Sequence, residues 1–584
     1  MKPLLKISTF FAASLLLFLN LSAQVKPINK SALDQKLDSL FKEFNNTSSP
    51  GYAITILQNG KVITKKDYGL ANLEFKVPFS HNTVVTIPYS EGREFISLAA
   101  ALLEEDGKLK LEDKVRKYFP NLPVWSESVT LQDLLNHSSG FCDEWATLVL
   151  TQASMNNRLD VSQFLNFLYN QPEPQVEPGK GYMYSNSDFG LLRLILEKAS
   201  GEKLPDYMER RIFKPLQMTA TTMRRDKEAV VANHAFSYFE NGANNYKVWL
   251  RDKASPGGNY AILTSANDLE LWAAAFADKN SFISKASERL KRNARPIPVL
   301  KEINYAYGHK LEKIGAYEMI THQGVSGYSY LVRIPAIELV VICTSNNLDP
   351  YSEKIIDLIN YLLQSERKIK PAPEKLPTAP ISIKGKDLQK YTGRYIWFTE
   401  NFQSTAKSST YYSFKVKSDT LYWHYSSTDI FPIQYVGNGI FKDPDYPIWL
   451  RFFQPHPDST MQIEARDSSV DKVFIWKKDT TVEPVLSNEY LKKLTGKYYS
   501  KHLDFYFTIV LNDENKLIVK RPTIADKILE PHSINEFKLP TEFYETNYES
   551  TFWVKFYFDA NGTPTHLDVR HGRLMHHRFD KIGN

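Results

Sequence analysis

A proline-rich segment divides this chain into two parts with different sequence patterns. Residues 370–380 read Lys-Pro-Ala-Pro-Glu-Lys-Leu-Pro-Thr-Ala-Pro, and four prolines in so short a stretch favour an extended, semi-rigid spacer. Before this segment, apolar residues recur with helical spacing up to Leu363; after it, short aromatic and β-branched runs alternate with turn residues. We therefore predict a linker over 369–385 between an N-terminal domain, 24–368, and an all-β C-terminal part.

Composition limits the function classes. The 584 residues suffice for three to four domains of ~150 residues each. The net charge of +6 comes without a long basic run, so we expect no nucleic acid partner. Cys142 and Cys343 form no CxxC motif and no Cys/His ligand spacing. We therefore predict no disulfide framework and no structural zinc. We also expect no metal and no cofactor elsewhere, since the N-terminal domain shows no metal-ligand set in its sequence.

The first residues have the pattern of a secretory signal peptide. Lys2 and Lys6 precede an apolar stretch, 10–21, and Ala23 stands at a cleavage position. The alternative is an uncleaved anchor, but the stretch is short for a ~30 Å hydrocarbon core. We predict a signal peptide over 1–23, a periplasmic or secreted protein, and no stable membrane insertion after cleavage.

The C-terminal part contains an internal repeat. Residues 388–395, Leu-Gln-Lys-Tyr-Thr-Gly-Arg-Tyr, resemble residues 491–498, Leu-Lys-Lys-Leu-Thr-Gly-Lys-Tyr. The glycine of each Thr-Gly-x-Tyr is expected to allow a bend into the first strand of its unit. We predict two small barrels or sandwiches, 386–482 and 483–584, which cover, dock or bind rather than catalyse.

A histidine cluster lies near the end of the chain, at His571, His576 and His577. Adjacent histidines on a strand point to opposite faces of the sheet, which argues against one shared metal. We interpret these residues as solvated side chains of an edge strand.

The N-terminal domain begins with a predicted helix over 31–44 and a strand over 52–58, followed by the hairpin signal Asn59-Gly60. A second, Ala- and Leu-rich helix is predicted over 94–109. Ser90 stands just before it. A serine in this position either caps the helix or acts as a nucleophile whose oxyanion lies near backbone N–H groups.

Several short blocks follow in a fixed order. They read Leu-Leu-Asn-His-Ser-Ser-Gly at 134–140, Tyr-Ser-Asn-Ser-Asp-Phe-Gly at 184–190, Phe-Lys-Pro-Leu-Gln-Met at 213–218, Pro-Gly-Gly at 256–258 and His-Gln-Gly-Val-Ser-Gly at 322–327. Over roughly residues 30–365 this ordered set resembles the serine β-lactamase-related family, which includes class C β-lactamases, penicillin-recognising DD-peptidases, D-aminopeptidases and esterases.

The resemblance implies an α+β fold, in which an antiparallel sheet flanked by helices adjoins an all-helical lobe and the active site lies between them. It also implies acyl transfer through a covalent acyl-serine on a D-peptide, β-lactam or ester substrate. Ser90 then matches the nucleophile, Tyr184 the residue that takes and returns protons, and Asn186 the residue that holds the substrate amide. His322 and Gly324 would line the far strand of the cleft, and the backbone N–H groups of Ser90 and Val325 would form the oxyanion hole.

One residue departs from the family pattern. The family nucleophile is followed three positions later by lysine, whereas this chain has Arg93 there. Lysine can lose its proton when buried, but arginine in a protein effectively cannot. The position of the nucleophile can be counted in two ways. Counted forward from Thr83, the family spacing reaches Tyr89; counted back from Phe95, it reaches Ser90. We adopt Ser90, because helix periodicity fixes the second count.

Three interpretations follow. In the first, the chain is an active serine hydrolase with Tyr184 as base and Arg93 as a fixed cation that favours tyrosinate and orients Ser90. In the second, it is a catalytically degenerate member, a pseudoenzyme that binds peptidoglycan-like ligands as a sensor or scaffold. In the third, the C-terminal β units carry the function by binding a carbohydrate or a partner protein. We favour the first, because the other cleft residues are retained.

Overall fold

The computed structural model describes residues 28–583 with internal gaps. The gaps are 88–91, 152–158, 226–228, 241–244, 250–261, 293–296, 301–302, 316, 322–328, 349–351, 364–378, 402–403, 425–429, 445–447, 457, 468–471, 481–483, 523, 542–549 and 572–573. The predicted signal peptide, most of the predicted linker, Ser90, His322, Gly324 and Val325 lie outside the described residues.

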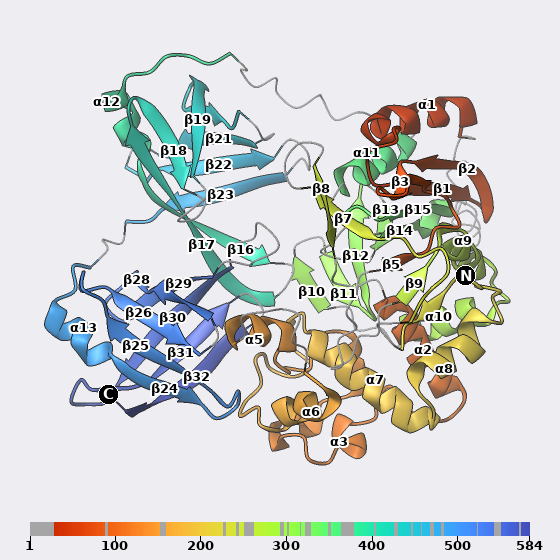
Figure 1. The fold of residues 1–584 in the computed structure, drawn as a ribbon, viewed down its shortest axis with the longest axis horizontal. Helices are drawn as coiled ribbons and strands as arrows, with labels where there is room; N and C mark the ends of the chain where they lie inside the picture. Colours follow the sequence, from red (N-terminus) through yellow and green to blue (C-terminus); the bar gives the residue numbers. More distant parts are fainter. Residues whose placement is uncertain are drawn as a thin grey trace, which may run out of the picture.

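The N-terminal domain is built on an eight-stranded antiparallel sheet in the order β10-β11-β12-β13-β14-β15-β1-β2 (Figure 1). Its strands are β1 (Tyr52–Gln58), β2 (Lys61–Tyr68), β10 (Ile297–Leu300), β11 (Ile303–Ala306), β12 (His309–Ile314), β13 (Tyr317–Thr321), β14 (Ser329–Ile334) and β15 (Leu339–Ser345). The predicted hairpin is confirmed: Asn59 and Gly60, both at positive φ, join β1 to β2.

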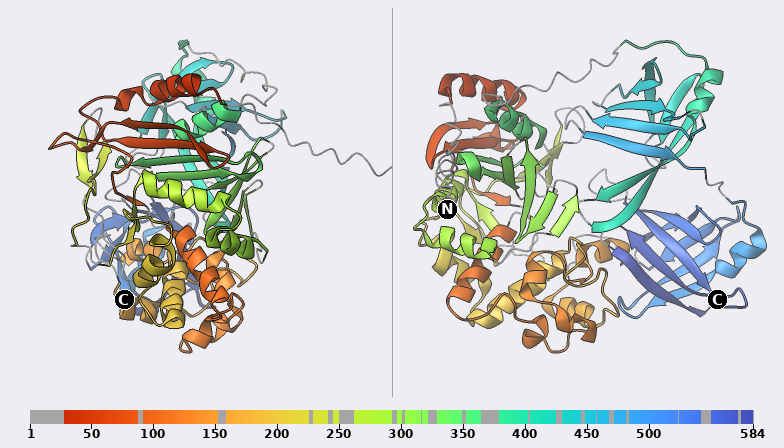
Figure 2. Two further views of the ribbon diagram at one scale, coloured as in Figure 1. Left: turned by 90° about the vertical axis from the view of Figure 1, so that its right-hand side faces the viewer. Right: turned by 180° about the vertical axis from the view of Figure 1, so that it is seen from behind.

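Helices cover both faces of this sheet (Figure 2). On one face, α1 (Lys30–Leu40) and α11 (Ser352–Leu363) pack Leu37 and Leu358 against Ile54 of β1. On the other face lie α9 (Ala266–Ala277) and α10 (Phe282–Arg292). All seven residues of β1 are consequently buried. The helix predicted over 31–44 ends at Leu40 and continues as a separate 3₁₀ turn, Lys42–Phe44.

A helical lobe lies beside the sheet. It comprises α2 (Arg93–Glu105), α3 (Val115–Tyr118), α4 (Leu131–Leu135), α5 (Glu144–Thr151), α6 (Val161–Tyr169), α7 (Asn186–Ser200) and α8 (Leu204–Met208). The second predicted helix is α2, which ends earlier than the predicted Leu109. Gly107, at φ +68°, turns the chain, and the backbone N–H of Lys108 bonds back to the carbonyl of Leu103 at 2.9 Å.

Shorter strands complete the domain. They are β3 (Leu70–Asn72) with β4 (Val77–Pro78), β5 (Val85–Ile87) with β9 (Ile262–Thr264) and β6 (Thr222–Met223), and β7 (Ser237–Glu240) with β8 (Tyr246–Trp249). In the described part of the chain, no helix is both long enough and apolar enough to span a membrane.

The first C-terminal unit is a closed eight-stranded barrel. Its strands are β16 (Gly393–Asn401), β17 (Ser404–Lys417), β18 (Thr420–His424), β19 (Ile430–Gly437), β20 (Ile440–Lys442), β21 (Ile448–Phe453), β22 (Gln462–Asp467) and β23 (Lys472–Lys478), and the short helix α12 (Gly385–Leu388) precedes them. Buried aromatic rings fill the barrel, among them Phe414, Phe452 and Trp476.

The second unit is a nine-stranded, nearly closed sheet in the order β27-β26-β25-β24-β32-β31-β30-β29-β28. Helix α13 (Asn488–Leu494) precedes β24 (Gly496–Ser500), β25 (Phe505–Leu511), β26 (Leu517–Arg521), β27 (Ile524–Ile528), β28 (Glu530–Pro531), β29 (Glu536–Thr541), β30 (Ser550–Phe558), β31 (Pro564–His571) and β32 (Leu574–Gly583). The prediction of two barrel-like all-β units is thus confirmed.

The sequence repeat corresponds to a repeated contact. The tyrosine of each Thr-Gly-x-Tyr is buried and donates its hydroxyl to a carbonyl of the preceding helical turn: Tyr395 to Tyr391 at 3.2 Å, and Tyr498 to Leu494 at 2.9 Å. This bond satisfies both a buried hydroxyl and an unpaired carbonyl at the end of a helix.

The glycines of this repeat are at positive φ, +125° at Gly393 and +139° at Gly496, as the predicted bend requires. We expect Gly496→Ala to lower the free energy of unfolding by about 1–3 kcal/mol, because its Cβ would lie 2.5 Å from the backbone oxygen of Gly583. In Gly393→Ala the corresponding contact is with the flexible Lys478 side chain, so the loss should be smaller. Urea denaturation of both variants checks this; equal stability of Gly496→Ala and wild type would contradict it.

The second β unit packs on the helical lobe, and their buried side chains form one continuous hydrophobic cluster. The amide of Gln175 donates to the carbonyl of His576 at 3.0 Å, and the ring of Phe167 stacks on that of His502 with 4.7 Å between centroids. The C-terminal unit is therefore held against the lobe by apolar packing and by specific polar contacts.

Candidate active site

Arg93, Tyr184 and Asn186 come together where α2 and α7 begin. Arg93 is the first residue of α2, Asn186 is the first residue of α7, and Tyr184 lies two positions before Asn186. Helix N-termini carry partial positive charge, so the start of each helix favours an anion nearby. The structure thus brings three of the predicted site residues into one cluster, although α2 and α7 are far apart in the sequence.

The Arg93 side chain is fully buried and contacts both of the other residues. Its Nη2 donates to Oδ1 of Asn186 at 2.6 Å, and its Nη1 donates to Nε2 of His137 at 3.1 Å. The guanidinium carbon lies 4.2 Å from the ring centroid of Tyr184 and 4.9 Å from that of Phe189. A planar guanidinium makes these hydrogen bonds through its edge while its flat face stacks on the rings, and an ammonium group has no flat face to stack.

The surroundings of Arg93 keep it charged. Burial alone would lower the pKa of Arg93, but Tyr184, Tyr305 and Asp143 raise it, and the net shift is upward. Because the group cannot release its proton, it cannot take one from a serine. Arg93 therefore acts in this site as a permanent cation and as a hydrogen-bond donor.

Two site residues that the sequence analysis did not identify, His137 and Asp188, extend this network. Arg93 offers only donors, so Nε2 of His137 must be the acceptor, and the ring proton lies on Nδ1. This Nδ1–H donates to Oδ2 of Asp188 at 3.0 Å, and the hydroxyl of Ser139 bonds to Oδ1 of the same carboxyl group. Burial raises the pKa of Asp188 well above its ordinary value, while Ser139 and Arg93 oppose that shift.

Asp143 fixes the orientation of Asn186. The Nδ2 of Asn186 donates to the Asp143 carboxylate at 3.3 Å, and the backbone N–H of Asn186 bonds to it at the same distance. Asp143 also accepts from the backbone N–H of Trp145 at 2.7 Å, at the start of α5. Because Arg93 donates to the amide oxygen of Asn186 and Asp143 accepts from its amide nitrogen, the Asn186 side chain is held in one orientation.

Tyr184 lies in an aromatic pocket. Its ring is buried and packs on His137, with centroids 4.5 Å apart, and edge-on against Tyr305 of β11 at 6.4 Å. Burial raises the pKa of Tyr305, and the neighbouring Arg93 opposes that shift. Tyr305 therefore stays protonated and serves as part of the wall around Tyr184 and Arg93.

Sequence signals for these additional residues were present but did not define a role. His137 lies in the Asn-His-Ser-Ser-Gly block, and Asp188 lies in the Tyr-Ser-Asn-Ser-Asp block. The hydrogen bonds that join the two blocks depend on how α4 and α7 pack, which the sequence pattern does not state.

A cavity of about 830 Å³ lies elsewhere, between α10 and the strands β12–β15. Arg93, Tyr184 and Asn186 do not line it. The cavity is therefore separate from the cluster of these three residues. Arg333, which pairs with Glu94, lines the cavity.

The prediction that the C-terminal histidines are solvated side chains of an edge strand is wrong. His576 and His577 do lie on opposite faces, but β32 is an interior strand, paired with both β24 and β31. His577 is accordingly buried, and its Nε2 lies 3.0 Å from the hydroxyl oxygen of Ser500. Strand order, which the local sequence does not reveal, places this side chain inside the protein.

Comparisons with known proteins agree with this architecture. The family model described as Beta-lactamase matches residues 37–366, more than half of the chain. Penicillin-binding protein 4* of Bacillus subtilis (strain 168) is 27% identical over 386 residues, which cover 62% of this chain and 82% of that protein. Protein flp of Staphylococcus aureus (strain MRSA252) is 28% identical over 250 residues, 41% of this chain and 48% of that protein.

Among solved structures, the octameric penicillin-binding protein homologue from Pyrococcus abyssi superposes with a TM-score of 0.52 at 20% identity, covering 77% of this chain and all of that one. At this identity the similarity concerns the fold alone. The match to more than half of the chain establishes that this protein belongs to the β-lactamase family, a family of serine hydrolases. The α+β fold and the family resemblance inferred from the sequence are both confirmed.

Proposed function

We propose that this protein is an exported serine hydrolase that forms an acyl-enzyme on Ser90 with a D-peptide, β-lactam or ester substrate. One observation supports this most strongly: Tyr184 and Asn186, which match a catalytic block of the family, both contact Arg93, which stands at the family's lysine position, where α2 and α7 begin. Such a cluster favours a functional role over a stabilising one, because burying a cation carries an unfavourable desolvation free energy.

In this proposal Tyr184 removes the proton of the Ser90 hydroxyl as the oxygen attacks the substrate carbonyl. The backbone N–H groups of Ser90 and Val325 stabilise the resulting oxyanion. Asn186, oriented by Arg93 and Asp143, binds the substrate amide. Tyr184 then returns its proton to the leaving group, and water releases the acyl group by the reverse sequence. His322 and Gly324 would line the opposite side of the cleft.

Export is the second part of the proposal. Lys2 and Lys6 before the apolar stretch 10–21, with Ala23 at the cleavage position, support it. A periplasmic or secreted hydrolase would meet peptide or small-molecule substrates related to the cell wall, and the Bacillus subtilis relative is named for binding penicillin, a β-lactam.

The alternative is a catalytically degenerate protein that binds such ligands without turnover. Arg93 itself favours this alternative, since it is hydrogen-bonded on both Nη atoms and cannot act as a base. A ligand-binding sensor or scaffold would need the oriented Asn186 but not proton transfer. The two functions therefore differ in a measurable property, the turnover of an acyl substrate.

Hydrolysis of a panel containing a D-amino-acid amide, a nitrophenyl ester and a chromogenic cephalosporin separates the two. We expect wild type to hydrolyse at least one of them and Ser90→Ala to lose that activity, while Ser97→Ala, a buried serine within α2, retains it. An inactive wild type whose Arg93→Lys variant gains turnover would favour the degenerate protein and contradict the proposed hydrolase.

A further inference from the structure

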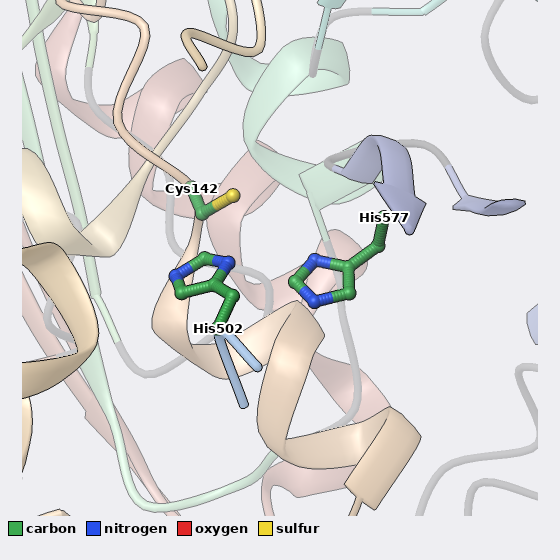
Figure 3. A group of neighbouring side chains, drawn as sticks. All are labelled: Cys142, His502 and His577. Atoms are coloured by element: carbon green, nitrogen blue, oxygen red, sulfur yellow. The ribbon is translucent and has the colours of Figure 1, made fainter. Parts of the chain in front are cut away.

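A cysteine and two histidines from distant parts of the sequence meet where the second β unit packs on the helical lobe (Figure 3). Cys142 precedes α5, His502 lies between β24 and β25, and His577 lies on β32. One candidate ligand atom from each residue lies within 4.8 Å of the other two. Cys142 and His577 are buried, and Cys142 forms no disulfide.

The hydrogen bonds of both imidazoles suit metal ligation. The Nε2–H of His502 donates to the carbonyl of Phe167 at 2.9 Å, since a carbonyl can only accept. Nδ1 of His502 therefore carries the lone pair. Nε2 of His577 contacts the Ser500 hydroxyl at 3.0 Å, which again leaves Nδ1 for a ligand. Metal-bound histidines commonly hold their second nitrogen in this way, with a carbonyl or another polar group.

We propose that Cys142, His502 and His577 bind one Zn²⁺ ion and thereby fasten the second β unit to the helical lobe. One thiolate and two neutral imidazoles are a set that this borderline-soft ion prefers, and a fourth position would remain for water. In tetrahedral zinc sites the ligand atoms are about 3.3–3.6 Å apart, so from separations of at most 4.8 Å the three ligand atoms would close in by up to about 1 Å.

Binding of the ion balances in protons. Each histidine would donate the lone pair of its Nδ1, and Cys142 would bind as the thiolate. The Zn–S bond forms as the S–H proton of Cys142 leaves to solvent, with the release of one proton per ion.

The position of the site has a consequence for the cleft. Cys142 is followed directly by Asp143, which orients Asn186. A metal on Cys142 would thus fix one end of the loop that holds the candidate active site, and would link that loop to the C-terminal unit. This site does not depend on the proposed hydrolase activity.

Metal content of the full-length mature protein tests the proposal. After EDTA treatment and gel filtration, titration with Zn²⁺ against a chromophoric chelator should give one tight site per chain. Cys142→Ser and His577→Gln should each weaken binding at least about 100-fold. Cys343→Ser, the other buried cysteine, and His576→Gln, the neighbour on the opposite face of β32, should bind as wild type does. Unchanged binding in Cys142→Ser would overturn the proposal.

A second measurement does not depend on how well the variants fold. Co²⁺ bound to the wild-type protein should show a thiolate-to-cobalt charge-transfer absorption, because Cys142 is a ligand. Zinc should also raise the melting temperature of wild type and of Cys343→Ser, since it binds the folded state alone. Cobalt binding without the charge-transfer band, or no binding of either metal, would show that these side chains only pack together.

Discussion

Tyr184→Phe should reduce the rate of Ser90 acylation by about 10²–10⁴-fold, the usual contribution of a positioned proton-transfer group. The phenylalanine ring keeps the stack on the Arg93 guanidinium and the packing on His137, so the variant removes the hydroxyl and little else. The measurement is the pseudo-first-order rate of labelling by a fluorophosphonate probe.

Tyr182→Phe is the matched control for this variant. Tyr182 is also buried and packs on His137 and Tyr305, with centroids 6.2 and 5.5 Å away. It has no role in the proposed proton transfer, so its variant should be labelled at close to the wild-type rate. If Tyr184→Phe were labelled as fast as wild type, the assignment of Tyr184 as the base would be wrong.

Glu94→Gln should lower the free energy of unfolding by about 3–5 kcal/mol, because it leaves a buried cation without its partner. Glu94 is buried directly after Arg93, pairs with Arg333, lies 3.2 Å from Nε2 of His309 and accepts from the Trp272 indole at 3.0 Å. Urea denaturation at pH 7 measures the difference.

The pH dependence of that difference follows from the pKa of Glu94. Burial alone would raise this pKa, but Arg333 and His309 lower it well below its ordinary 4.5. The stabilisation is therefore fully present above about pH 4.5 and is lost as the pH falls towards the folded-state pKa. The difference in the free energy of unfolding between wild type and Glu94→Gln should therefore shrink in acid.

Glu105→Gln, at the exposed end of α2, is the control and should change the free energy of unfolding by less than about 1 kcal/mol. An equal loss in both variants would contradict this account.

Local patterns were sufficient to predict the fold class and part of the site. The Asn59-Gly60 hairpin, the helix after Ser90 and the Tyr184–Asn186 block each depend on residues close together in the sequence. Their order along the chain identified the family. Arg93 could be singled out because it stands where the family has lysine. The structure shows its partners, which are His137, Asn186 and the ring of Tyr184.

The remaining features depend on packing between distant segments. The bonds from Arg93 to His137 and from His137 to Asp188 exist because α2, α4 and α7 converge. His577 is buried because β32 lies between β24 and β31, and strand order is not encoded in the residues around it. For the same reason Cys142 has no Cys/His ligand spacing in the sequence, yet it lies close to two histidines of the second β unit.

The central claim is that Ser90 is acylated in a site where Arg93 replaces the usual lysine. Intact-mass and peptide-mapping analysis of the protein after reaction with a fluorophosphonate or fluorescent penicillin tests it most directly. We predict one adduct per chain, on Ser90, that is absent in Ser90→Ala. An unlabelled wild type together with an Arg93→Lys variant that is labelled on Ser90, or an adduct on Tyr89 in place of Ser90, would contradict the claim.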